Sequence, residues 1–72
     1  MTPIPDLLDT VALTEDVPAH GLWRGQVGTV VEVYEGGAVE VEFSDDEGRA
    51  YAMLALRPEQ VLVLRFAPEA AA

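Results

Sequence analysis

The chain has no cysteine, no lysine and no long run of apolar residues. Without cysteine it can form neither disulfides nor thiolate metal sites, and it has no thiol nucleophile. A membrane-spanning helix needs about 20 consecutive apolar residues, and the sequence offers no such stretch. The first ten residues also lack the basic segment of a secretory signal. These absences favour a cytoplasmic protein with no membrane partner.

Positive charge is scarce as well. Four arginines stand against 13 acidic residues, so the formal net charge is -9 at pH 7. A protein that binds nucleic acid through its phosphates needs a basic stripe, which four arginines cannot supply. The same charge would be attracted to a basic protein, and long-range attraction would speed that association. We therefore expect a protein partner rather than a nucleic acid.

Apolar residues are abundant for so short a chain, since half of the 72 residues are hydrophobic. This length allows one domain, which buries only about 60% of its unfolded surface. Some apolar side chains should therefore stay exposed, and small domains often cover them by pairing with another chain, so a homo-oligomer is compatible with the sequence. We assign residues 1–8 to an extended arm, residues 9–66 to the domain and residues 67–72 to a flexible tail.

The middle of the chain is typical of a β-hairpin. Residues 25–43 carry β-branched side chains on both sides of a glycine pair at 36–37. Two adjacent glycines can close a two-residue turn because both tolerate positive φ. Such a turn would place Val33 opposite Glu40, or opposite a near neighbour if a bulge intervenes. The alternation over residues 39–43 predicts one buried face and one solvent-facing side.

Strands are also expected on both sides of this hairpin. Residues 9–13 indicate a first strand, and a helical turn over residues 6–8 is the alternative. Residues 50–56 are apolar on both faces, so this strand is either buried on both sides or presents one side to a partner. A short helical turn is expected over residues 57–60, because a proline suits its first position.

Two connections are expected to be loops. Residues 14–23 show no period of 2 or 3.6, and Leu22 and Trp23 should fold over one end of the hairpin. Residues 44–48 should form a turn in which aspartate side chains bond the backbone and Gly48 takes a positive φ.

The last strand is expected over residues 61–66. Arg65 alternates in step with Val61 and Val63, and its charge indicates that this side faces solvent. The other side of the strand, with Leu62, Leu64 and Phe66, should therefore point inward. Five short strands with a 3-10 turn before the last predict an all-β fold, a small five-stranded SH3-like barrel. Its expected core consists of Val39, Val41, Phe43, Leu54, Leu56, Leu62 and Leu64.

No catalytic set can be assembled from the residues present. His20 is the single histidine and Ser44 the single serine, so no nucleophile, base and orienting group can be combined. Residues 45–47 lack the spacing of a calcium loop, which favours a solvated turn over a weak cation site. Residues 25–28 form a GxxG, for which turn or bulge geometry is a better interpretation than nucleic-acid binding. We expect no enzyme activity, no metal and no cofactor.

Exposed aromatic and acidic residues are the candidate binding groups. Trp and Tyr are enriched at interface hot spots, whereas charges at the rim mainly set the association rate. Trp23 suits core filling as well as partner contact, and Tyr34 shares the outward parity of Glu32. The candidate partner-binding residues are Trp23, Tyr34, Tyr51 and Met53 as apolar anchors, and Glu32, Asp45, Asp46 and Glu47 as the acidic rim.

Several segments in combination resemble a known family. They are LDTVAL at 8–13, RGQVGTVVEV at 24–33, VEVEF at 39–43, Tyr51 and LRPEQV at 56–61. Together they resemble the short acidic bacterial proteins of the domain of unknown function 4926 family, over nearly all of the chain except its arm and tail. That family has no assigned activity, so the resemblance implies the fold and leaves the function open.

A looser resemblance concerns the GxxGxV pattern, which is similar to the KOW element of ribosomal and transcription factors. The chain lacks the basic residues of KOW proteins, which disfavours RNA binding and leaves protein binding.

The leading hypothesis is a non-enzymatic module that binds a basic protein encoded nearby and neutralises it, as an antitoxin does. One alternative is an accessory subunit that supports the assembly of an enzyme. The other is an acidic mimic of nucleic acid. Gene context would separate the first two, and competition with nucleic acid would identify the third.

Overall fold

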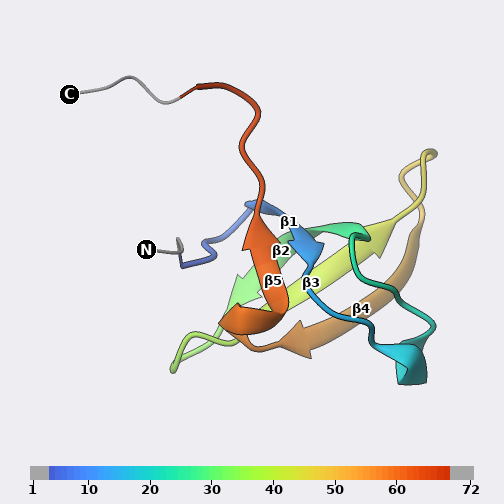
Figure 1. The fold of residues 1–72 in the computed structure, drawn as a ribbon, viewed down its shortest axis with the longest axis horizontal. Coiled ribbons are helices and arrows are strands. Elements are labelled where there is room, and N and C mark those ends of the chain that lie inside the picture. Colours follow the sequence, from blue (N-terminus) through green and yellow to red (C-terminus); the bar gives the residue numbers. More distant parts are fainter. Residues whose placement is uncertain (1–3, 69–72) are drawn as a thin grey trace.

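A computed structural model of the chain describes residues 4–68 and shows a small curled β-sheet (Figure 1). Over these residues the chain forms strands and 3-10 turns. In order, they are β1 (Thr10–Leu13), η1 (Pro18–His20), β2 (Val27–Val33), β3 (Val39–Ser44), β4 (Ala50–Leu56), η2 (Pro58–Gln60) and β5 (Val61–Val63). The predicted arm and tail lie partly outside the described residues, because residues 1–3 and 69–72 are not among them.

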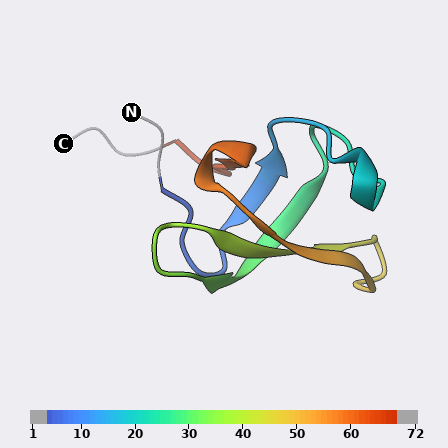
Figure 2. The same cartoon turned by 90° about the horizontal axis from the view of Figure 1, so that it is seen from below.

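The strands form one antiparallel sheet in the order β4-β3-β2-β1-β5. The chain therefore meanders from β1 to β4 and then returns through η2 to place β5 beside β1. Because η2 joins two strands at opposite edges of the sheet, the sheet has to curl (Figure 2). The prediction of an all-β, five-stranded fold with a 3-10 turn before the last strand is confirmed.

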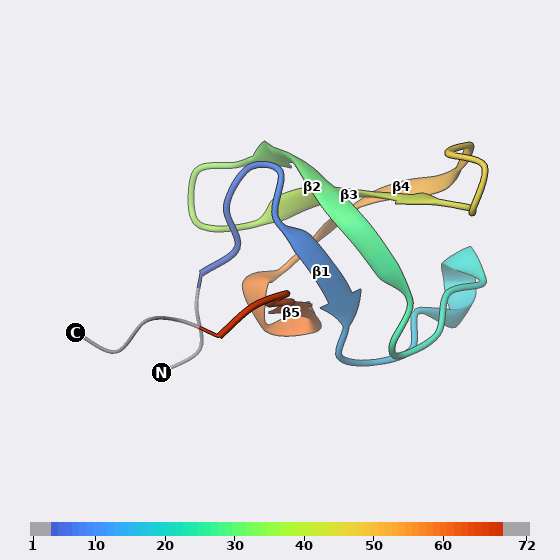
Figure 3. The ribbon, with the colours of Figure 1, turned by 90° about the horizontal axis from the view of Figure 1, so that it is seen from above.

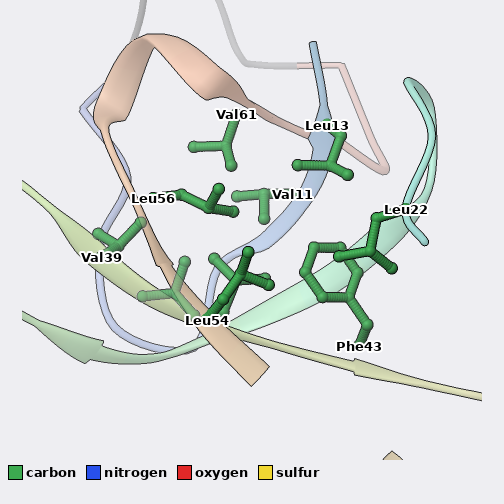
Figure 4. Packing of buried hydrophobic residues seen from close by; sticks show 10 residues of the cluster. Val11, Leu13, Leu22, Val39, Phe43, Leu54, Leu56 and Val61 are labelled. Carbon is green, nitrogen blue, oxygen red and sulfur yellow. The ribbon is translucent and has the colours of Figure 1, made fainter. Parts of the chain in front are cut away.

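The curl creates one enclosed apolar face. Its core draws on all five strands and on Leu22 (Figure 4). Of the seven predicted core residues, Val39, Val41, Phe43, Leu54 and Leu56 are buried. Among residues 4–68, the buried hydrophobic core is Val11, Leu13, Leu22, Val30, Val39, Val41, Phe43, Leu54, Leu56 and Val61.

The phase predicted for the last strand is wrong. Val61 is buried and Val63 packs against the core, whereas Leu62 is 48% exposed and Phe66 is 81% exposed. The strand ends at Val63, so Arg65 lies beyond the ladder and its charge says nothing about which strand residues face inward. Leu64 is only half-buried for the same reason.

The predicted hairpin exists, but its register differs by one residue. Val33 pairs with Val39, and Glu32 pairs with Glu40. The N–H of Tyr34 bonds the carbonyl of Ala38, and the N–H of Gly37 bonds the carbonyl of Tyr34, so the turn holds three residues rather than two between Tyr34 and Ala38. The ladder also shifts between Val30 and Glu32, where a bulge absorbs one residue. These two changes still keep Val39 and Val41 on the buried side.

Short local structure lies on both sides of β1. The loop at 14–23 contains η1 and a bridge between Val17 and Leu22, and Figure 3 shows its excursion away from the sheet between β1 and β2. Leu22 is buried as predicted, but Trp23 is 55% exposed and does not cover the hairpin. Before β1, the N–H of Asp9 bonds the carbonyl of Asp6, so the alternative turn coexists with the strand.

Gly28 is the tightest point of the sheet. It lies in β2 opposite Val11 of β1 and is fully enclosed. A Cβ at this position would lie 2.6 Å from Cγ1 of Val41 and 2.8 Å from the carbonyl oxygen of Glu42. The second of these neighbours is backbone, which cannot rotate away. The absence of a side chain at Gly28 therefore lets the curled sheet close over its own core.

We expect Gly28→Ala to lower the free energy of unfolding by about 1–3 kcal/mol, the usual cost of overpacking a filled core. Urea denaturation monitored by circular dichroism measures this change. Gly48→Asn is the control, because position 48 is open and Asn tolerates its φ of 81°. A Gly28→Ala protein as stable as the wild type would contradict the close approach.

Candidate functional site

The side of the sheet opposite the core is a mixed acidic and apolar surface. The alternation in β3 buries Val39, Val41 and Phe43 and so directs the residues between them outward. Cross-strand partners share a face, which extends this surface across β2, β3 and β4. We call it the outer face, and it consists of Thr29, Glu32, Tyr34, Glu40, Glu42, Met53 and Ala55.

Three carboxylates lie at the centre of the outer face. Glu32 of β2 is directly opposite Glu40 of β3, and Glu42 follows two residues along β3. Like charges in directly opposed positions destabilise a sheet. Between residues 4 and 68, no ion pair links these glutamates to a basic side chain; Arg49 pairs with Glu47, and Arg57 with Glu59, in the turns that flank β4. The outer face therefore carries negative charge that the described chain leaves uncompensated.

Tyr34 is attached to this group of carboxylates. Its hydroxyl donates a 2.8 Å hydrogen bond to Oε1 of Glu40. That bond favours the neutral phenol, and partial burial and the charges of Glu40 and Glu32 act in the same direction, so the pKa of Tyr34 is raised above its ordinary value of 10.0. The bond ties the exposed side chain of Tyr34 to the row of carboxylates.

Two other predicted anchors lie on or beside β4. Met53 faces outward opposite Glu42 and is 53% exposed. Tyr51 occupies the position where the β3–β4 register shifts, and its ring lies 6.4 Å from that of Phe43. Its contact with Phe43 gives Tyr51 a structural role in addition to its exposure.

Gln26 connects Tyr51 with the fourth predicted anchor. Its Oε1 accepts a 2.6 Å hydrogen bond from the N–H of Trp23, and its Nε2 donates to the hydroxyl of Tyr51. Trp23 and Tyr51 are therefore held at the same end of the sheet. Tyr34 lies beyond the other end of β2, so the four predicted anchors do not form one cluster.

The predicted acidic rim is also divided. Residues 45–47 form the turn after β3, which projects from the sheet (Figure 1). Oδ1 of Asp45 accepts hydrogen bonds from the N–H groups of Glu47 and Arg49, so this side chain shapes the turn. Glu47 is paired with Arg49 at 3.4 Å. Of the rim residues, Glu32 alone belongs to the outer face.

Several outward-facing residues were missed by sequence reasoning. Glu40 and Glu42 were recognised as solvent-facing but not as site residues; their parity with Val39 and Val41 was the available signal. A second exposed row crosses β2, β1 and β5, where Ala12 pairs with Val27 on one side and with Leu62 on the other. The incorrect phase of β5 concealed this row.

Other kinds of site find little support in the described residues. Over residues 4–68, no group of three or more His, Asp or Glu side chains is arranged to hold a metal ion. His20 is exposed in η1. In the same part of the chain, no helix has the length and apolar character needed to cross a membrane.

Glu40→Gln should lower the pKa of Tyr34 toward its ordinary value, because the mutation removes the main charged acceptor of the phenol. The absorbance of the phenolate near 295 nm reports the titration, and a Tyr51→Phe background leaves Tyr34 as the one tyrosine in the chain. Glu35→Gln in the hairpin turn is the control and should shift the titration less. An unchanged Tyr34 titration in Glu40→Gln would show that the two side chains are not coupled.

Comparison with known proteins identifies a family for this chain. The family model for a domain of unknown function (DUF4926) matches residues 7–63, which run from just before β1 to the end of β5. No curated protein and no solved structure matches the chain. Since the family model spans the whole sheet, the chain belongs to the DUF4926 family.

Proposed function

We propose that this protein is a cytoplasmic, non-enzymatic interaction module whose outer face binds a basic protein. The observation that carries the proposal is the row of Glu32, Glu40 and Glu42, which no described cation compensates. Repulsion between Glu32 and Glu40 would be relieved by a cationic side chain placed between them. Binding a basic partner would therefore stabilise the sheet as well as the complex.

The apolar members of the outer face support a protein rather than a small ion as ligand. Tyr34 and Met53 lie beside the carboxylates and remain substantially exposed. Aromatic residues and methionine are enriched in the centres of protein interfaces, and Tyr34 is already oriented by its bond to Glu40. An arginine side chain fits this composition, because its guanidinium can pair with a carboxylate while its plane stacks on a tyrosine ring.

Net charge supports the same partner at longer range. A body with a formal charge of -9 attracts a basic protein and raises the association rate, most strongly at low ionic strength. The partner that we propose is a basic protein encoded nearby, which the module neutralises in the manner of an antitoxin. The absence of a residue set for nucleophilic catalysis is consistent with a binding role.

The test compares capture by two variants of equal charge. The face variant carries Glu32→Gln and Glu42→Gln, and the control carries Glu15→Gln and Glu59→Gln, which lie near η2 and away from the outer face. Tagged proteins are incubated with lysate of the native cell at low salt. Wild type and control should retain the same stoichiometric basic companion, and the face variant should lose most of it, which from near-saturation requires a loss of affinity well above tenfold.

Equal retention by the face variant would exclude the outer face as the binding surface. Absence of any stoichiometric companion would count against the function as a whole.

A further inference from the structure

β4 is an unprotected edge of the sheet. It pairs with β3 along one side, and within residues 4–68 no strand pairs with its other side. No backbone N–H or C=O of residues 50–56 bonds any described segment other than β3. In an antiparallel pair, alternate residues direct these groups away from the partner, so a strand of seven residues presents a row of free donors and acceptors.

β4 has few of the features that usually block such an edge, and its one irregularity is the register shift against β3 at Tyr51, close to its first residue. Natural edge strands are kept short or carry lysine, proline or inward-pointing charges. β5, the opposite edge, follows this rule with three residues. β4 instead has seven residues, AYAMLAL, with no charge and no proline. A long, uncharged, apolar edge is a template for pairing with another strand.

The distribution of charge favours a second copy of this chain as the occupant. Glu40 and Glu42 lie on β3, one strand inside the edge. If two β4 strands paired, the β3 strands of the two copies would be three strand spacings apart, about 14 Å. This distance exceeds the screening length of about 8 Å at physiological ionic strength. The edge itself is therefore where two acidic copies can approach with little repulsion.

The two ends of β4 differ in charge. Arg57 follows the strand and pairs with Glu59 at 3.1 Å, so this end is locally neutral. Arg49 precedes the strand and pairs with Glu47, but residues 45–46 leave the turn before β4 acidic. In an antiparallel pair of β4 strands, this acidic turn lies beside the neutral end of the other copy rather than beside its acidic turn. The strand itself carries no charge, and a strand from a basic partner would find no carboxylate on β4 to pair with.

We propose that β4 pairs antiparallel with β4 of a second copy, about a two-fold axis perpendicular to the sheet. The dimer contains one continuous sheet of ten strands, twice the five of each copy. Because this axis keeps both outer faces on the same side, the dimer presents two acidic outer faces side by side. This inference goes beyond the proposed partner binding and does not require it, since a single copy already carries the complete outer face.

Sedimentation equilibrium of the purified full chain tests the proposal. The weight-average mass should rise from 7.8 kDa toward twice that value with increasing protein concentration. Association should strengthen between about 0.05 and 0.5 M NaCl, because salt screens repulsion between two acidic copies. Binding of a basic partner should weaken over the same range, so the two kinds of association respond to salt in opposite directions.

Met53 provides the decisive variant, because it is the central residue of β4 and lies nearest the proposed axis. Met53→Glu should raise the dimer dissociation constant at least about tenfold by bringing two carboxylates together. Thr29→Glu is the matched control. Thr29 and Met53 flank the same Glu42 from opposite sides, so both variants add one charge beside it, but Thr29 lies on an interior strand.

The proposal is supported if the wild type and Thr29→Glu form the dimer and Met53→Glu does not. A wild type that stays monomeric at every concentration and salt level would overturn it, as would equal dimerisation of all three proteins.

Hydrogen exchange in the wild type gives a readout that does not depend on a variant folding. Backbone amides of residues 50–56 should become more protected as protein concentration rises, and protection independent of concentration would contradict the pairing.

Discussion

The alternation of β3 is the constraint on which the rest of this structure depends. Val39, Val41 and Phe43 fill the enclosed side of a sheet that has room for one small core. Their parity fixes the register of both neighbouring strands, since a slip of one residue would exchange the apolar and acidic sets. Burial of one face thus determines the composition of the other, and Glu40 and Glu42 are placed outward by the same packing that stabilises the fold.

The outer face follows from this constraint but is not optimised for stability. The pairing of Glu32 with Glu40 sets two negative charges in opposition at the centre of the sheet. A threonine or a basic residue at either position would suit an isolated sheet better. Such opposed charges, with Tyr34 and Met53 beside them, are the basis of the partner binding that we propose for this surface.

Sequence reasoning succeeded where local pattern and tertiary packing agree. The alternation over residues 39–43 predicted β3 and its buried side, and β4 and η2 were predicted at the residues where they occur. It failed where the pattern does not show how long a turn is or where a ladder ends. The register at Val33 follows from a turn with three residues rather than two between Tyr34 and Ala38, and the phase of β5 was read from Arg65, which lies beyond the ladder. The role of Gln26 depends on hydrogen bonds that composition does not reveal, whereas the backbone hydrogen bonds of an aspartate in the turn at residues 44–48 were predicted and occur at Asp45.

The central claim is that the carboxylates of the outer face serve binding and not folding. Its most direct test is the free energy of unfolding of a variant with Glu32→Gln, Glu40→Gln and Glu42→Gln, measured by urea denaturation at low salt. Glutamine keeps an acceptor for Tyr34 and removes the repulsion. The account predicts a free energy of unfolding equal to that of the wild type or higher by up to about 1 kcal/mol. A loss of more than about 1 kcal/mol would show that these charges hold the sheet together and would contradict the account.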